Sequence, residues 1–428
     1  MLVGVGRSAG LGTGCWVVVL SGLVWGTMQP ALVYAETKIV PLATLSGGYD
    51  SNIWRRPAEL LAPGTRLDDF VTNIGGGARV LHNTRNIDVS ADMGATFNAY
   101  VHNTNRNFFA MNVRGSLGLD RWVDQYVRGA KLRVVESLRY SPDPPAFMGG
   151  IRSVILEDDT FLRGTPALRS NQIINLTRID GKYPMSRDLA LEGGYAFGLR
   201  HYGRVQGGDA LSTTLFNTIT HTWYGGPRYQ LTRNDSVAAI YRQTFFTQTR
   251  STGSRTISTN LISLVGDYTR EFQEWSLTIQ GGVTFAEPVG RTFPSGSIQV
   301  RTRPERDTVV TFSLSREGRP IGFLQGGAMI SHVAQVGISH RVYERLTING
   351  TVAYAYNQLF PSTDSTIKNF TASSRLRYML TRTMSADVTY AFNNIDVDVA
   401  QLEYQVSRHQ VGFALSMAFD PLGVELWD

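Results

Sequence analysis

Histidines are the side chains of this sequence best suited to metal binding and to acid–base catalysis near neutral pH. There are seven, at His82, His102, His201, His221, His332, His340 and His409. No two of them are four residues apart, which is the spacing that places two ligands on one face of a helix. No arrangement of serine and histidine in the sequence indicates a hydrolase site. The sequence therefore predicts no catalytic residue, no metal, no cofactor and no enzyme activity.

Two short acidic segments contain the oxygen ligands that calcium prefers, namely Asp50-Ser51-Asn52 and Glu157-Asp158-Asp159. Neither segment has the spacing of an EF-hand loop. Asp, Asn and Ser also form hydrogen bonds with their own backbone in turns. We therefore interpret both segments as turns rather than as calcium sites.

The composition narrows the classes of protein that the chain can belong to. Its 428 residues are 42% hydrophobic and 11% aromatic, which excludes a disordered chain. After residue 35, no uncharged apolar run approaches the roughly 18 residues of a transmembrane helix. The only cysteine is Cys15, so a chain without its N-terminus has no disulfide and no cysteine ligand. The net charge of +6, without a block of Lys and Arg, indicates no nucleic-acid partner.

The first 35 residues have the properties of a targeting signal. They carry one charge, Arg7, and an apolar stretch from Cys15 to Trp25. Val33-Tyr34-Ala35 places small residues three and one positions before a cleavage site. We expect a signal peptide over residues 1–35, cut after Ala35; the alternative is a membrane anchor. The mature chain, residues 36–428, then leaves the cytoplasm of a Gram-negative bacterium.

The elements of the mature chain are indicated by an alternation of period two. Residues 87–101, 109–119, 275–285 and 346–356 each alternate apolar side chains with polar or small ones. This pattern is typical of β-strands with one apolar face. The segments are about 10–14 residues long, whereas soluble strands have about 5–6 residues and transmembrane β-strands about 9–11. The pattern favours a membrane barrel, with a soluble all-β protein such as a propeller as the alternative.

A short motif containing Tyr and Arg recurs along the chain and predicts the topology. Its copies lie at 183–188, 229–234, 268–271, 340–345 and 378–383. Pro304-Glu305-Arg306-Asp307 fills the slot between 268 and 340, and two earlier short turns lie at 82–86 and 122–125. The intervals fit two strands and a loop, so the eight turns share one rim, as periplasmic turns do. With strands at 39–49 and 406–419, we expect an all-β, antiparallel up-and-down transmembrane β-barrel of about 18 strands, with 16 as the alternative. Residues 420–428 form a short C-terminal tail.

The last strand carries a signal of its own. Val411, Phe413, Leu415, Met417 and Phe419 alternate with small or polar residues. This pattern resembles the C-terminal signal by which outer-membrane barrels are recognised for insertion. We therefore expect outer-membrane lipid and the barrel-assembly machinery as partners, and the cell outer membrane as the location.

One segment near the start of the mature chain resembles a known family. Tyr49-Asp50-Ser51-Asn52-Ile53-Trp54, the repeated turns and the Pro144-Pro145-Ala146-Phe147 loop resemble the β-barrel porins associated with exopolysaccharide and PEP-CTERM (exosortase) loci. The resemblance covers most of residues 36–419. It implies an outer-membrane barrel that works with polysaccharide export components, and it supplies no catalytic residue.

Alternation also assigns charged side chains to the barrel lumen. The basic residues expected there are Arg114, Lys131, Arg133, Arg139, Arg178, Lys182, Arg200, Arg242, Arg301, Arg303, Arg375, Arg377 and Arg408. The acidic residues are Asp88, Asp92, Asp120, Asp180, Glu192, Asp267 and Asp387. Rings of Arg and Lys favour anions in a pore. The alternative is that the arginines pair with lumen acids and only fill space.

From this set we select six lumen residues as the candidates for ion selectivity. They are Lys131, Arg133, Arg301, Arg303, Arg375 and Arg377. The two arginine pairs are expected next to the short turns, and Lys131 and Arg133 nearer the middle of their strand. Residues 141–171 form the longest loop, which we expect to constrict or cap the pore.

The leading functional hypothesis is an outer-membrane channel for the export or passage of anionic saccharides or exopolysaccharide. A barrel of about 16–18 strands leaves an aqueous lumen that side chains alone do not fill. The first alternative is a non-conducting structural barrel of a periplasmic export machine. The second is an enzyme built on a barrel, for which the sequence offers no clustered site.

Overall fold

The computed structural model describes residues 36–61, 63–141, 170–205, 215–250, 256–320, 327–360, 365–399 and 402–424. The predicted signal peptide and most of the predicted constriction loop lie outside these residues, so both stay predictions. Among the described residues, no helix is long and apolar enough to cross a membrane.

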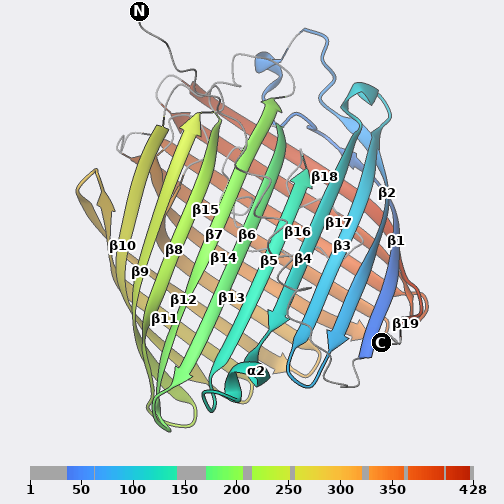
Figure 1. Cartoon of the computed structure of the whole chain (residues 1–428). Helices are drawn as coiled ribbons and strands as arrows, with labels where there is room; N and C mark the ends of the chain where they lie inside the picture. The colour runs from blue at the N-terminus through green and yellow to red at the C-terminus, as the bar shows by residue number, and fades with distance from the viewer. Residues whose placement is uncertain are drawn as a thin grey trace, which may run out of the picture.

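Eighteen long strands form the wall of the molecule (Figure 1). They are β1 (Glu36–Asp50), β2 (Asp69–Asn83), β3 (Asp88–Tyr100), β4 (Phe108–Gly118), β5 (Lys131–Ser141), β6 (Ser170–Pro184), β7 (Leu189–Val205), β8 (Phe216–Gln230), β9 (Asp235–Arg250), β10 (Thr256–Glu271), β11 (Trp275–Glu287), β12 (Arg291–Glu305), β13 (Thr308–Pro320), β14 (Ala328–Tyr343), β15 (Leu346–Phe360), β16 (Thr366–Met379), β17 (Met384–Val399) and β18 (Leu402–Ala418). Each strand pairs antiparallel with its neighbours in sequence. The predicted fold class is confirmed.

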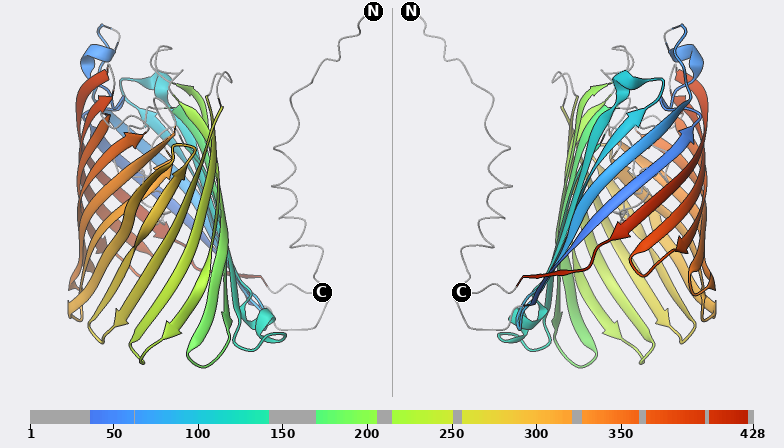
Figure 2. Two further views of the ribbon diagram at one scale, coloured as in Figure 1. Left: turned by 90° about the vertical axis from the view of Figure 1, so that its left-hand side faces the viewer. Right: turned by 90° about the vertical axis from the view of Figure 1, so that its right-hand side faces the viewer.

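The first and last long strands close the sheet into a barrel. Leu42 of β1 pairs with Ala418 of β18, and the ladder continues to Asp50 and Gln410. This closure confirms 18 strands rather than 16. The predicted tail contributes one further short strand that the sequence did not predict, β19 (Leu422–Val424). It pairs with the first residues of β1 below the end of β18, and Figure 2 shows it leaving the barrel wall there.

The short connections gather on one rim, the turn side, and the longer ones on the opposite rim, the loop side. The turn-side connections are residues 84–87, 119–130, 185–188, 231–234, 272–274, 306–307, 344–345 and 380–383. All eight predicted turns are found there. The connection at 119–130 is not a short turn, because it contains the helix α2 (Asp120–Asp124). Asp120 therefore lies in this connection, and its prediction as a residue of the lumen wall was wrong.

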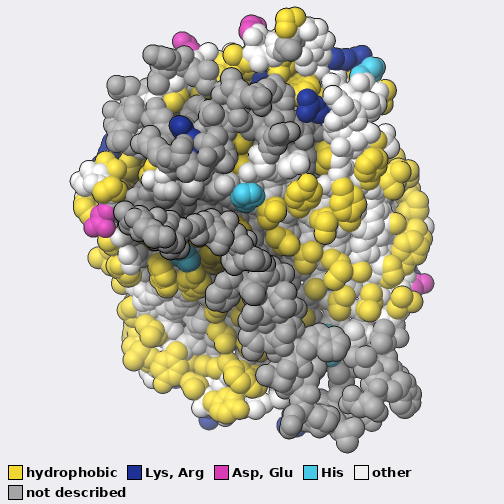
Figure 3. Space-filling model, turned by 45° about the horizontal axis from the view of Figure 1, so that its top comes forward, with side chains coloured by type: hydrophobic (Ala, Val, Ile, Leu, Met, Phe, Trp, Pro, Cys, Tyr) yellow, Lys and Arg dark blue, Asp and Glu magenta, His cyan; other side chains and the backbone are white. Residues whose placement is uncertain are grey.

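The two faces of the wall differ as the alternation predicts. Many outward-facing side chains are large and apolar; Leu264 and Val283, for example, are 61% and 53% exposed. Figure 3 shows these apolar side chains spread over the outer surface, with few charges between them. Inward-facing side chains are mostly charged, amidic or hydroxylic. Glycines allow strands to approach closely, since a Cβ at Gly77 would lie 2.3 Å from the Met93 carbonyl oxygen.

Candidate functional site

The lumen is the candidate functional site, and the six predicted selectivity residues lie on its wall near the turn side. Lys131 and Arg133 begin β5, and they pair with Lys182 and Asp180 of β6. Lys131 is the first residue of its strand, so the expectation that this pair lies nearer mid-strand was wrong. Arg301 lies near the lower end of β12 and pairs with Thr311 of β13.

The basic side chains of β5 and β12 remain available to solutes. Lys131, Arg133, Arg301 and Arg303 are all exposed. Arg133 Nε donates a hydrogen bond to Ser116 Oγ at 3.2 Å. None of the four forms an ion pair with a carboxylate of the described residues. Because β5 and β12 are seven strands apart in a wall of 18, these charges approach the lumen from widely separated sides.

Arg375 and Arg377 of β16 are held by one buried acid. Arg375 Nε and Arg377 Nε lie 2.9 and 2.8 Å from Asp387 Oδ1 of β17. Their second guanidinium nitrogens donate to Asp387 Oδ2 at 3.0 and 3.2 Å. The Asp387 side chain is fully buried between them. Two positive charges and one negative charge leave this part of the lumen with a net charge of +1.

A chain of ion pairs covers the opposite part of the wall. Lys182 Nζ lies 3.0 Å from Glu192 Oε1, and Arg228 lies 2.8 Å from Glu192 and 2.9 Å from Asp267. Arg228 was not among the predicted lumen residues. It follows Gly225-Gly226-Pro227. The two glycines have no side chain, so the alternation of apolar and polar residues cannot be followed there.

Arg79 was missed for the same reason, since it follows Gly75-Gly76-Gly77. Its guanidinium lies 2.6 Å from Asp92 of β3. A paired arginine next to a predicted lumen acid adds no net charge. The surplus of positive charge in the lumen therefore comes from residues of β4, β5, β9 and β12 that form no ion pair within the described part of the chain, namely Arg114, Lys131, Arg133, Arg242, Arg301 and Arg303.

The loop-side mouth of the lumen contains a buried apolar cluster, here called the mouth cluster. It consists of Leu215, Met329, Leu359, Ile367, Val397 and Val399, with Tyr202, Ile395 and Tyr404 packed against it. Leu215 and Tyr202 belong to the β7–β8 side of the wall, and the others belong to β14–β18. The cluster therefore spans the mouth from one side of the barrel to the other, and it narrows the lumen there.

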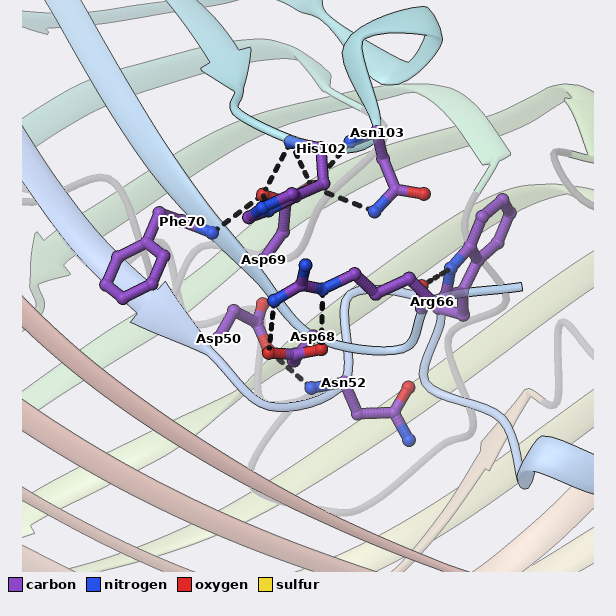
Figure 4. Close-up of polar contacts among 9 residues, drawn as sticks. Asp50, Asn52, Arg66, Asp68, Asp69, Phe70, His102 and Asn103 are labelled. Carbon is purple, nitrogen blue, oxygen red and sulfur yellow. Dashed lines mark hydrogen bonds and ion pairs between the residues drawn. The ribbon is translucent and has the colours of Figure 1, made fainter. Parts of the chain in front are cut away.

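The acidic motif Asp50-Ser51-Asn52 forms a hydrogen-bonded corner at the loop side of the barrel (Figure 4). Asp50 Oδ1 accepts hydrogen bonds from Arg408 Nε at 2.9 Å and from the Asn52 backbone N–H at 3.0 Å. The neighbouring Asp69 accepts hydrogen bonds from the backbone and side chains of His102 and Asn103. Both carboxylates accept several hydrogen bonds from protein groups. The described residues contain no cluster of three or more potential metal ligands.

The loop that follows this motif folds onto the barrel. Ile53 and Trp54 are buried against Val71 and Tyr100, and Trp54 Nε1 donates to the Arg66 carbonyl at 2.9 Å. Burial lowers the pKa of Arg56. The motif that carried the family resemblance is thus the corner where β1, β2 and β18 meet.

A family model matches the C-terminal part of the chain. It is described as "Putative beta-barrel porin 2" and matches residues 294–417, which run from β12 to β18. The association with exopolysaccharide loci, which the resemblance implied, is not part of this match. No curated protein matches the sequence.

Solved structures with a similar outline are outer-membrane barrels of low sequence identity. OccAB2 of Acinetobacter baumannii has a TM-score of 0.45 at 10% identity, covering 90% of this chain and 98% of its own. OpdQ of Pseudomonas aeruginosa has a TM-score of 0.42 at 10% identity, covering 92% and 98%. The FrpB iron transporter of Neisseria meningitidis has a TM-score of 0.40 at 9% identity, covering 93% and 83%. Similarities this low say nothing of the solute.

Proposed function

We propose that the protein is a porin-like channel of the cell outer membrane that prefers small anionic solutes. The observation that carries this proposal is the contrast between an apolar outer face and a lumen wall whose cations near the turn side form no ion pair with any described carboxylate. An apolar outer face suits the hydrocarbon of a bilayer, where only closed barrels and helices satisfy the hydrogen bonds of their backbone. The match to a porin family over residues 294–417 supports the same function.

The unpaired cations give the lumen its anion preference. Lys131 and Arg133 on β5 and Arg301 and Arg303 on β12 are exposed to the lumen water. A lumen with low-dielectric walls focuses the field of such charges and raises the local concentration of anions. The Asp387 cluster adds one further positive charge.

The wall between these cations suits solutes that carry hydroxyl groups. The inward positions of β11–β15 include Thr278, Gln299, Ser313, Gln335 and Asn349. Amide and hydroxyl side chains donate and accept hydrogen bonds. Anionic saccharides combine both features, so we infer that they are the solute class. The narrow apolar mouth favours small saccharides over a polymer chain.

Ion selectivity in planar bilayers tests the proposal. A unit charge about 8 Å away contributes about 0.5 kcal/mol in water, and screening at physiological salt leaves about 0.2 kcal/mol. Arg301→Glu with Arg303→Glu changes the wall charge by four units, so an anion loses about 0.8 kcal/mol and a cation gains as much. The anion-to-cation preference should then fall by about fifteenfold at physiological salt.

A control variant separates lumen charge from net charge. Arg345→Glu with Arg382→Glu changes the net charge equally, but both residues lie in exposed turns outside the wall. Its zero-current potential in a salt gradient should stay close to that of the unchanged protein. Equal shifts in the two variants, or a preference for cations in the unchanged protein, would contradict the proposal.

A further inference from the structure

The sheet is not continuous at the loop side, because β12 and β13 separate there. Their ladder ends at Gly296 and Arg316. Above this pair β12 continues upward to Arg291, still paired with β11. β13 continues to Pro320, still paired with β14. The wall is therefore split, and the upper ends of β13–β15 are free of β12.

These free ends lie inside the barrel rather than in line with its wall. Ala328 and Ile330 of β14 and Phe360 of β15 are buried. They pack in one cluster with inward-facing residues of β9–β12, namely Phe246, Leu261, Ala286 and Phe293. Along β14, Ile330 shares the outward-facing side of the strand with Val336 and Ile338, which are each 48% exposed. The outward-facing side of the ends of β14 and β15 thus packs against the inward-facing side of β9–β12.

Two specific contacts fix this arrangement. The Gly327 backbone N–H, next to β14, donates a hydrogen bond to Gln248 Oε1 of β9. Gly318 of β13 lies so close to β10 and β12 that a Cβ there would be 3.2 Å from Leu261 Cδ1 and 2.8 Å from Phe293 Cζ. In an unbroken wall β10 and β13 are three strands apart, or about 14 Å. The contact between Gly318 and Leu261 therefore exists only when the ends are folded in.

The other side of the same strand ends faces the mouth cluster. Met329 points to the opposite face of β14 from Ala328 and Ile330. It packs with Leu359 of β15 and with Leu215 from the opposite wall. The strand ends are consequently held between two apolar surfaces. Moving them outward, back in line with β12, would withdraw Met329 and Leu359 from the mouth.

We propose that the upper ends of β13–β15, residues 317–320, 327–331 and 358–360, form a hydrophobic gate that closes the channel by folding into its mouth. This inference rests on the proposed channel function. Apolar constrictions stop ions by expelling water from the pore. The open seam above Gly296 and Arg316 supplies the freedom to move, since no backbone ladder ties the gate to β12. The gate closes when Gly318 approaches Leu261, and it opens when they separate.

A disulfide between the gate and the wall tests this proposal. In Leu261→Cys with Gly318→Cys the two Cβ atoms can approach within disulfide range only in the closed state. The variants are made in the chain of residues 36–428, whose sequence contains no natural cysteine. In planar bilayers, oxidation of this variant should abolish most of the current, and dithiothreitol should restore it. The control is Ile348→Cys with Leu376→Cys, a directly paired couple on the outer face of β15 and β16, which should cross-link without changing the current.

Opening the gate provides a second measurement. Ile330→Asn weakens the packing of the gate on β9–β12, so the current carried by the variant should rise above that of the unchanged protein. Both measurements are made on protein that shows the heat-modifiable mobility of a folded barrel.

Each outcome bears on one of the two proposals. If the gate pair fails to cross-link while the control pair does, the strand ends do not fold in, and the gate is refuted. The same follows if the pair cross-links without any change in current. If no variant conducts, reduced or oxidised, including Ile330→Asn, the channel function itself is wrong.

Discussion

Asp50→Asn is expected to weaken the closure of the barrel between β1 and β18. Asp50 and Arg408 are 3% and 5% exposed, and both oxygens of Asp50 accept hydrogen bonds from the Arg408 guanidinium. Gln410 Nε2 donates to Asp50 Oδ2 at 3.2 Å. This pair joins the first and the last long strand at the loop side, where 358 residues of sequence separate them.

The magnitude follows from the burial of the pair. Removing the acid of a buried ion pair costs about 3–5 kcal/mol. The asparagine can still accept the hydrogen bond from the Asn52 backbone, so we expect the lower end of this range, about 3 kcal/mol. The double variant Asp50→Asn with Arg408→Gln removes the buried cation together with its acid. Its free energy of unfolding should therefore lie above that of Asp50→Asn alone.

Equilibrium unfolding by urea in lipid vesicles, followed by the mobility shift of the folded barrel, measures these free energies. Asp396→Asn is the matched control, because Asp396 pairs with Lys368 at 3.3 Å on the outer rim, with side chains 40% and 46% exposed. An exposed pair contributes about 0–1 kcal/mol. If the two single variants lose the same stability, the buried pair is not what holds the seam.

Three further predictions concern the wall. Ile298→Arg places a cation on the outer face in the middle of β12, at a cost of about 2–4 kcal/mol in a bilayer. Gln299→Arg faces the lumen and should fold with nearly the yield of the unchanged protein. Equal yields of the two variants would contradict the assignment of the two faces. Asp387→Asn leaves Arg375 and Arg377 without their acid, so the zero-current potential should shift toward anions, and a shift toward cations would contradict the assigned lumen charge. The purified mature chain should be rich in β-structure and monodisperse only in detergent or lipid, as ultracentrifugation with and without detergent can show.

The strand pattern was predictable because each strand is exposed to two different solvents. Leu264 and Val283 on one face and Asp267 and Gln280 on the other follow directly from alternation. A single residue of slip would exchange the faces, so the pattern also fixes the register. The turns were predictable because their Tyr and Arg recur at the intervals that two strands require.

The lumen charges were predictable in sign but not in their pairing. The sequence presents Arg375 and Arg377 as two free cations. Their acid, Asp387, lies on the next strand, and the sequence does not show that the two strands pair so that Asp387 reaches both arginines. Arg79 and Arg228 were hidden by glycine runs that carry no face information. Only the contacts between neighbouring strands show which arginines are neutralised. Among the described residues, Arg114, Lys131, Arg133, Arg242 and the β12 pair form no ion pair with a carboxylate.

The folding of β13–β15 into the mouth cannot be predicted from the alternation of apolar and polar residues along each strand. Ile330 follows the alternation of an outward-facing residue, and alternation therefore assigns it to lipid. In the structure its side of the strand faces Leu261 and Phe293 of the neighbouring wall. Alternation tells which residues share a face, but what that face meets depends on whether the strand stays in the wall. The sequence feature that permits the departure is Gly318, since only a residue without a side chain leaves room for the Phe293 ring at this distance.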